Sequence, residues 1–585
     1  MQPEFWAVAA ALATLPLASG QTWCGKVYMA NETVVPPGGA FPVPASSPSP
    51  LLALRCNPAL IPFLPDDVSS GASILVDALV RYSHIVGAQD VTIPDGDTST
   101  LHVTASIDGN VLGRVDVGLN GTAALSFDLS SLEPRTAAYT LTCEGTLGDQ
   151  TFQSSSNLTF LPTPPDNIGS VTKRDLRTGG LLAKAVGSAG DYEPVLPVGF
   201  YTSWGGYLEG NNTVVEVLHD QGFNMIHPVP TYDNQTALNE FLEQMEKLNM
   251  WLMYDMRWTY MNDTSVTTEV SPLRPLKNLL LYYTADEPDG TSDPLNATTH
   301  AYDLIRALDP YRPTSLVLNC QDYFFSEYAA GADVLLQDVY EVGNNVTFST
   351  EWGTPCTRIQ GDCGCDNCAG RFEDIRDRVT DFKERMEVLG WERTKSVWTV
   401  PQGFGGAEFV RVLSPRRYWS RAPTGEEWLV EAIVGINAGA LGVVSWNDPT
   451  TADIKAASSK LAQAVPALTP FILSPASTFQ HVITADRLDL GVWSNGREHL
   501  VLASNLNYEN RSVSLQDVFG DAKVGEARVV LDAGASVGDG VIRFGSVQSG
   551  AWVFAAGNKA GSSSSSSAAS IAAPANSLAS PRVEL

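Results

Sequence analysis

The sequence predicts an α/β fold in which a (β/α)8 TIM barrel is flanked by N-terminal and C-terminal β-sandwich domains. Between about residues 195 and 473, apolar strand-like runs alternate with amphipathic helical runs. Eight such units in roughly 280 residues match the usual size of this barrel. Short alternating strands separated by turns occupy residues 21–165 and 474–556, a pattern that is typical of small sandwiches.

Residues 1–20 are predicted to be a secretory signal peptide. A short apolar run from Trp6 to Leu17 precedes the small residues Ala18, Ser19 and Gly20. The run is too short to span a membrane, and no later run is long enough either. Asn-x-Ser/Thr glycosylation motifs lie beyond it, which also favours export. They begin at Asn31, Asn120, Asn157, Asn211, Asn234, Asn262, Asn296, Asn345 and Asn510.

Residues 21–165, after the signal, are predicted to form β-structure. Residues 102–107 and 111–117 alternate in polarity on either side of an Asp-Gly-Asn turn at 108–110, which predicts a hairpin. Residues 166–194 are expected to form a linker with a second hairpin, whose tip is Gly179-Gly180. This hairpin leads into the barrel.

The barrel elements follow from periodicity. The strands are expected at 197–201, 224–228, 251–255, 279–284, 315–319, 334–340, 396–400 and 441–446. The helices are expected at 213–221, 238–248, 302–308, 372–389, 428–437 and 452–465. A doubly wound open sheet is the alternative fold, but no glycine-rich phosphate loop follows the first strand.

The C-terminal part has two distinct sections. Asn495-Gly496 between two apolar runs predicts a tight hairpin in the second sandwich. Residues 557–585 are rich in Ser and Ala and are predicted to be disordered. They lack the hydrophobic tail of a lipid-anchor signal, so we expect a free secreted protein, with cell-wall association as a further option.

Charge narrows the range of partners. The formal net charge is −28, from 65 acidic and 37 basic residues. Such a balance argues against nucleic acid or an anionic membrane surface as a partner. It also disfavours a strongly anionic polysaccharide and leaves neutral glycans as partners.

The cysteines indicate disulfides. The chain has eight, all after the signal, and an even number in an exported chain favours pairing. The cluster at 356–368 would alternatively suggest a structural zinc site, but its spacing is not a paired C-x-x-C pattern. A disulfide-bonded loop is therefore the favoured interpretation, and the connectivity stays open.

The most informative stretch is an apolar strand that stops at Asp286-Glu287-Pro288-Asp289-Gly290. Proline cannot continue a sheet ladder and glycine favours a turn, so the acids lie at the end of the strand. In a parallel barrel the carboxyl ends of the strands build the active site. Two carboxyl groups at that position are what cleavage of a glycosidic bond requires. The alternative is a solvent-exposed turn without function.

Polar and aromatic residues end the other predicted strands. Aromatic faces suit the C–H faces of sugar rings, and carboxylates, amides and histidine suit hydroxyl groups. Any single aromatic could instead belong to the barrel core, and His227 could be an ordinary hydrogen-bonded strand-end residue. The candidate substrate-binding residues are Tyr201, Trp204, His227, Asp255, Arg257, Asn319, Tyr340, Gln402 and Trp446.

A strand ending Ala285–Asp289, followed two strands later by Asp338-Val339-Tyr340, resembles secreted (β/α)8-barrel glycoside hydrolases with flanking β-sandwich domains. It is most similar to little-characterised members of that superfamily. The resemblance implies that Glu287 is the acid/base residue. It also implies that Asp286 positions an N-acetyl group, as in chitinase-like barrels, and that Trp446 forms a pocket floor.

The sequence departs from these families in two ways. Barrels with acid and nucleophile on strands four and seven need a glutamate ending strand seven, where this chain has Gln402. The nearest acid is Glu408 in the following loop. The full chitinase-type D-x-x-D-x-D-x-E series is also absent.

Together these features predict a secreted glycoside hydrolase that acts on a neutral or N-acetylated glycan. Glu287 would be the general acid and Asp338 the base or nucleophile, with Glu408 as the alternative and Asp286 as their neighbour. No metal or organic cofactor is required, no G-x-S-x-G elbow is present, and a monomer is expected. The alternatives are a cell-wall transglycosylase and a non-catalytic glycan-binding or wall-structural protein.

Overall fold

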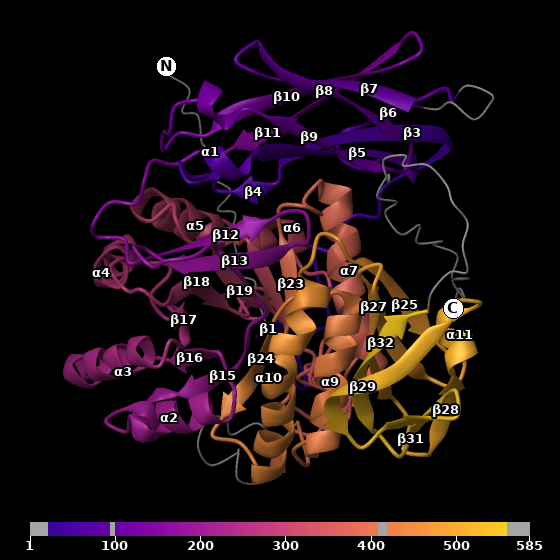
Figure 1. Ribbon diagram of the computed structural model, residues 1–585. Coiled ribbons are helices and arrows are strands. Elements are labelled where there is room, and N and C mark those ends of the chain that lie inside the picture. The colour runs from indigo at the N-terminus through magenta and orange to yellow at the C-terminus, as the bar shows by residue number, and fades with distance from the viewer. Residues whose placement is uncertain (1–20, 94–99, 407–417, 558–585) are drawn as a thin grey trace, which may run out of the picture.

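The computed structural model describes residues 21–93, 100–406 and 418–557. At its centre is a closed barrel of parallel strands, which confirms the predicted fold (Figure 1). The strands in barrel order are β15 (Val198–Ser203), β16 (Met225–Val229), β17 (Trp251–Asp255), β18 (Leu279–Asp286), β19 (Thr314–Leu318), β20 (Val334–Gln337), β23 (Ser396–Thr399) and β24 (Val443–Asp448).

Helices surround the barrel in Figure 1. They are α2 (Thr213–Asp220), α3 (Gln235–Lys247), α4 (Asp263–Leu273), α5 (Ala297–Leu308), α6 (Phe325–Ala330), α7 (Glu373–Leu389), α9 (Gly425–Ala438) and α10 (Ala452–Ile472). Neither α4 nor α6 is predicted by periodicity, because α4 is rich in Thr, Ser and Val and α6 is very short. Helix α10 continues past the expected end near Val465 through Pro466 and Pro470, because Leu468, Phe471 and Ile472 are buried there.

The barrel strands are buried on both faces. In β18, every residue from Leu279 to Ala285 is buried, as expected for a parallel strand with helices outside and side chains filling the interior. Inside the barrel, Met225, Met253 and Leu281 belong to one packed cluster. The barrel is therefore a filled core, and a ligand can only approach its ends.

A small sheet closes the end of the barrel at which the strands begin. It contains β4 (Leu60–Ile61), β12 (Ser170–Asp175), β13 (Gly180–Ala185) and β14 (Glu193–Val195), and the predicted Gly179-Gly180 tip joins β12 to β13. Leu181 and Ala183 pack into the interior cluster of the barrel. The Ser170 hydroxyl donates to the carbonyl of Leu279, at the start of β18, over 2.8 Å. A ligand site is therefore expected at the opposite end of the barrel, where the strands finish.

The N-terminal sandwich consists of two four-stranded sheets. One contains β3 (Ser46–Pro58), β5 (Ala72–Ser83), β6 (Ala88–Asp90) and β9 (Thr122–Phe127); the other contains β7 (Thr100–Ile107), β8 (Asn110–Gly118), β10 (Tyr139–Leu147) and β11 (Gln150–Leu158). A disulfide between Cys56 and Cys143 joins the two sheets. Arg393, beyond the end of α7, forms an ion pair with Asp77 of β5 and connects this domain to the barrel.

The C-terminal domain packs against α9 and α10. Its larger sheet contains β25 (Thr478–Ile483), β26 (Leu488–Ser494), β27 (Glu498–Asn505), β29 (Val524–Ala533) and β32 (Ser549–Ala556), and its smaller sheet contains β28 (Arg511–Ser514), β30 (Ser536–Gly538) and β31 (Val541–Phe544). The predicted Asn495-Gly496 turn lies between β26 and β27. Asn437 of α9 donates to the carboxylate of Asp489 over 2.8 Å and holds the domain against the barrel.

Residues 22–27 lie apart from the N-terminal sandwich, which begins at Ser46. They form the small hairpin β1 (Thr22–Trp23) and β2 (Lys26–Val27) beside the end of β19. A disulfide between Cys24 and Cys320 attaches this hairpin to the barrel. A segment that precedes the first sandwich in sequence therefore becomes part of the barrel mouth.

Three sequence predictions lie outside the described residues: the signal at 1–20, the tail from 558 onward and Glu408. All eight cysteines are paired, so the predicted disulfides are confirmed; the remaining bonds are Cys356–Cys363 and Cys365–Cys368. No helix within 21–93, 100–406 and 418–557 is long and apolar enough to cross a membrane.

Candidate active site

A cavity of about 170 Å³ lies at the carboxyl ends of the barrel strands. It brings together the three predicted acids Asp286, Glu287 and Asp338. Four of the predicted substrate-binding residues, Tyr201, Asn319, Tyr340 and Trp446, also line it. The remaining lining residues are Trp23, Val317, Asp362, Gly364, Phe404, Tyr418 and Trp419.

The backbone at the end of β18 determines where Glu287 lies. The pairing of β18 with β19 shifts register between Tyr283 and Asp286, and Glu287 adopts a left-handed φ of 50°. A non-glycine residue rarely takes this conformation, and when it does it often belongs to a functional site. The Glu287 backbone N–H donates to the carbonyl of Val317 over 3.2 Å, which fixes the residue against the neighbouring strand.

Asp289 stabilises the turn that follows Glu287. Its carboxylate accepts hydrogen bonds from the backbone N–H groups of Gly290, Asn319 and Cys320, over 2.9, 3.2 and 2.8 Å. These bonds connect the loop after β18 to the end of β19. Glu287 at the end of β18 and Asn319 at the end of β19 are thereby held in a fixed relative position.

Glu287 and Asp338 form a carboxyl pair. The side chains are close enough to hydrogen-bond to each other, and the Asn319 amide donates to both, over 3.0 Å to Glu287 and 3.3 Å to Asp338. Burial, the charge of Asp338 and the hydrogen bond from Glu287 to Asp338 raise the pKa of Glu287 well above its usual value. Burial also raises the pKa of Asp338. The two carboxyl groups interact, so the protonation of one depends on the charge of the other.

The separation of the two catalytic carboxyl groups of a glycosidase depends on its mechanism. Retaining enzymes keep their pair about 5–5.5 Å apart and inverting enzymes about 6.5–9.5 Å. Of the two groups, Glu287 has the more strongly raised pKa and is therefore the better candidate for the proton donor.

Asp286 has a different environment from its neighbour. The Arg257 guanidinium donates to one of its oxygens over 2.7 Å, and the Tyr283 hydroxyl donates to the other over 2.5 Å. The Tyr201 hydroxyl in turn donates to Tyr283 over 3.3 Å. Since both carboxylate oxygens are bound by donors from beneath the cavity, Asp286 is suited to accept a hydrogen bond from a ligand in a fixed orientation.

Three predicted binding residues lie below the cavity rather than on its wall. Asp255 accepts hydrogen bonds from Arg257 over 2.7 Å and exchanges one with His227 over 2.8 Å. Burial lowers the pKa of His227, which is fully enclosed, and so favours its neutral form. Burial would raise the pKa of Asp255, but Arg257 and His227 outweigh it and leave the pKa below its usual value. In this structure the three form the support for Asp286.

Trp204 and Gln402 also lie away from the cavity wall. The Trp204 ring packs against Tyr232 and Phe241 in the core, with centroids 5.4 and 5.5 Å away. The side-chain amide of Gln402 is fully buried and bonds to both the backbone N–H and the carbonyl of Val342. At the end of strand seven this chain therefore has a side-chain amide whose hydrogen bonds connect the loop after β23 to the loop after β20.

An aromatic wall was not predicted from the sequence. Phe404 contacts Tyr340 and Trp419 with centroid distances of 4.9 and 4.8 Å, and Tyr340 contacts Trp419 at 6.0 Å. Phe404 and Trp419 belong to the long connection after β23, where no periodic pattern marks a residue as a wall component. Only Tyr340, close to a strand end, carried a signal that periodicity could detect.

Trp23 is the other residue that sequence reasoning missed. Its indole N–H donates to the Oδ1 atom of Asn319 over 2.9 Å, and its ring covers Gly290 so closely that a Cβ there would come within 2.4 Å. The neighbouring Cys24–Cys320 disulfide holds it in place. Trp23 therefore orients the amide that contacts both Glu287 and Asp338.

Replacing Trp23 by Phe is expected to lower kcat for a hydrolysed glycan about fivefold with little change in KM. The ring would remain, but the Asn319 amide would lose a hydrogen bond worth on the order of 1 kcal/mol. Trp258→Phe is the matched control, because Trp258 is 69% exposed. Steady-state kinetics of both variants check this, and equal kcat values would contradict the positioning role.

No group of three or more His, Cys, Asp or Glu side chains within 21–93, 100–406 and 418–557 is arranged to hold a metal ion. That the reaction requires no cofactor remains a prediction.

The chain matches no protein-family model. No curated protein matches it either. Similar solved structures include an α-amylase from Anoxybacillus (13% identity over 60% of this chain and 90% of that one, TM-score 0.38) and a GH30 endoxylanase from Clostridium papyrosolvens (10%, 62% and 97%, 0.38). A β-glucuronidase from Ruminococcus gnavus is also similar (12%, 69% and 62%, 0.31). All three are glycoside hydrolases by name. Structural similarity at these TM-scores does not assign a function to this chain, so the function is argued from the side chains of the cavity.

Proposed function

We propose that this protein is a secreted glycoside hydrolase that cleaves O-glycosidic bonds of a neutral or N-acetylated glycan. The observation that carries the proposal is the carboxyl pair Glu287 and Asp338 at the mouth of the barrel, bridged by the Asn319 amide. The pair lies in a cavity with aromatic rings on its wall. Export is proposed from the predicted signal and agrees with the four disulfides, which persist in oxidising compartments.

The chemistry follows from the charge states of the three acids. The raised pKa of Glu287 favours its protonated form, which can donate its proton to the glycosidic oxygen as the bond to the anomeric carbon breaks. Asp338 then faces the developing positive charge, either as the base that activates water or as the nucleophile. Asp286, held by Arg257 and Tyr283, is placed to accept a hydrogen bond from a hydroxyl or N-acetyl N–H of the sugar.

The surroundings of the acids favour a neutral sugar. Asp286, Glu287, Asp338 and Asp362 all line the cavity, and an anionic substrate would be repelled by carboxylates at this short range. Trp446 and Trp419 offer flat apolar faces for the C–H faces of a sugar ring. Arg257 lies 5.1 Å from the Trp446 ring centroid and fixes that ring from below.

The test is hydrolysis of a glycan panel by the purified protein. The panel comprises β-1,3-glucan, cellulose, xylan, mannan, chitin and peptidoglycan, and released reducing ends are measured. Sugar release from at least one glycan, absent in a variant that lacks the Glu287 acid, is the expected result. Transfer products in place of free sugar would indicate the transglycosylase. Binding of a glycan without release by the unmodified protein would contradict the enzyme proposal and leave a glycan-binding barrel.

A further inference from the structure

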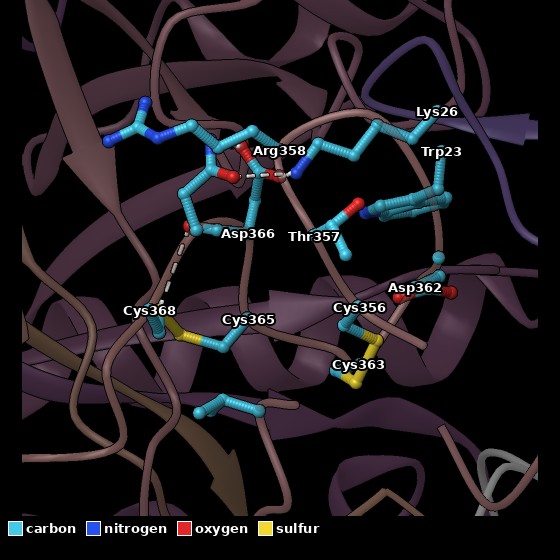
Figure 2. A pocket seen from close by; sticks show the side chains of 13 residues that line it. Trp23, Lys26, Cys356, Thr357, Arg358, Asp362, Cys363, Cys365, Asp366 and Cys368 are labelled. Atoms are coloured by element: carbon cyan, nitrogen blue, oxygen red, sulfur yellow. Dashed lines mark hydrogen bonds and ion pairs between the residues drawn. A yellow bond between two sulfur atoms is a disulfide. The ribbon is translucent and has the colours of Figure 1, made fainter. Parts of the chain in front are cut away.

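A second cavity, of about 190 Å³, adjoins the candidate active site (Figure 2). Trp23 and Asp362 line both cavities, so the two meet at these side chains. The wall of the second cavity consists of the β1–β2 hairpin and the loop 356–368, which contains two disulfides. We refer to it as the disulfide-loop cavity.

The disulfide-loop cavity is rigid. Cys356–Cys363 and Cys365–Cys368 both lie on its wall in Figure 2, which limits the conformations of the loop. Gly361 has a left-handed φ of 90°, and a Cβ there would lie 2.1 Å from the carbonyl oxygen of Pro355. The backbone N–H of Gly361 also donates to Val27 of the hairpin over 2.9 Å. A rigid, preformed concavity is typical of a binding site.

A buried cation lies in this wall. The Lys26 side chain is only 6% exposed and forms an ion pair with Asp366. It also donates to the Asn367 side chain over 2.8 Å. An ammonium group has three N–H donors, so two partners leave one for a ligand. A buried charged donor with spare capacity, facing a cavity, is an arrangement suited to bind a hydroxyl oxygen.

The other polar groups are balanced in charge. Asp366 compensates Lys26, and the cavity also presents Arg358 with Asp362. Arg358 forms no ion pair within the described parts of the chain and extends along the cavity in Figure 2. Thr357 lies at the exposed rim, where its hydroxyl accepts hydrogen bonds from the backbone N–H groups of Ile359 and Gln360. This mixture of donors and acceptors with little net charge fits the hydroxyl groups of a neutral sugar better than an ionic group.

We propose that the disulfide-loop cavity is a second sugar-binding subsite, which holds the residue next to the cleaved bond. The inference rests on the proposed function and extends it, since it makes the substrate an oligosaccharide or polysaccharide. Trp23 lies between the two cavities and offers its indole face at the junction. The hairpin at the N-terminal end of the described chain thus contributes to both sugar positions.

The experiment is a binding series on a Glu287→Gln background, where turnover is expected to be about 10²- to 10⁴-fold slower. Isothermal titration would use glucose and N-acetylglucosamine with their cello-, laminari- and chito-oligosaccharides of two to six residues. Affinity is expected to rise at least tenfold from one sugar to the chain that fills both cavities. Adding Thr357→Trp, which fills the cavity from its rim, is expected to remove this rise and leave monosaccharide affinity unchanged. Arg358→Ala should reduce the rise about threefold.

Ile359→Trp is the matched control, because Ile359 is 45% exposed in the same loop and does not line the cavity. The rise should persist in this variant. An affinity that does not increase with chain length, or an increase that Thr357→Trp and Arg358→Ala both leave intact, would overturn the subsite. Hydrolysis of the same oligosaccharides by the unmodified protein is measured in parallel. Chain-length-dependent binding without hydrolysis would reject the hydrolase and keep the subsite.

Discussion

Replacing Glu287 by Gln is expected to lower kcat/KM about 10²- to 10⁴-fold, the usual range for loss of general acid catalysis. Gln has the same shape, and its carbonyl can still accept the hydrogen bond from the Asn319 amide. Its amide can still donate to Asp338. The variant should therefore fold and bind glycan while lacking the proton for the leaving oxygen.

Three measurements check this expectation: initial rates on the hydrolysed glycan, binding of that glycan and the thermal unfolding temperature. Glu426→Gln, on the exposed start of α9, is the control and should behave like the unmodified protein. A folded Glu287→Gln protein that keeps more than a tenth of the rate would show that another group donates the proton. Substrates with a good leaving group, such as aryl glycosides, should lose less than the natural glycan, because they need less protonation.

The Asp338→Asn variant is expected to show a similar loss of kcat together with a changed pH profile. Hydrolysis needs Glu287 in its protonated form, so activity falls as the pH rises through the pKa of this group. The charge of Asp338 contributes to raising that pKa, and removing it lowers the pKa. The alkaline limb of the residual activity should therefore move to lower pH.

The pH profile of kcat/KM between about pH 3 and 9 is the measurement, because it reports the groups of the free enzyme. Asp362→Asn is the matched control, since it removes another carboxylate from the same cavity and should move the limb less. An alkaline limb that stays in place in Asp338→Asn would mean that the charge of Asp338 does not contribute to the raised pKa of Glu287. A loss of rate without the shift would then assign Asp338 to the reaction but not to the control of this pKa.

The barrel could be predicted because the sequence of each of its main strands and helices shows a local pattern of apolar residues. The run Leu279–Thr284 is apolar throughout and is bounded by a proline-containing turn, and α7 repeats apolar residues at helical spacing. Parallel strands ending at one rim then imply that Glu287, Asn319 and Asp338 lie close together, as the structure shows. Helices α4 and α6 escaped prediction because packing, rather than sequence periodicity, keeps them helical.

The remaining candidate residues could not be assigned by their position at a strand end. His227 and Gln402 were expected at strand ends as Tyr201 was, yet only Tyr201 lines the cavity, because the residue that faces it depends on the tilt and twist of each strand. Trp23 lies 296 residues from Asn319, and no local pattern connects them. Their contact depends on the pairing of Cys24 with Cys320, which eight cysteines in a single sequence do not reveal.

The sequence by itself determined the eight-stranded barrel, its two β-domains and the acids at the end of the fourth strand. These depend on the order of apolar and polar residues over short distances. Only the tertiary structure decided that Glu287 and Asp338 form a buried pair bridged by Asn319, that Arg257 supports Asp286 and that a distant hairpin completes the mouth. The physical reason is that pKa values and cavity walls depend on distances between residues on different strands. These distances are fixed only when the barrel closes.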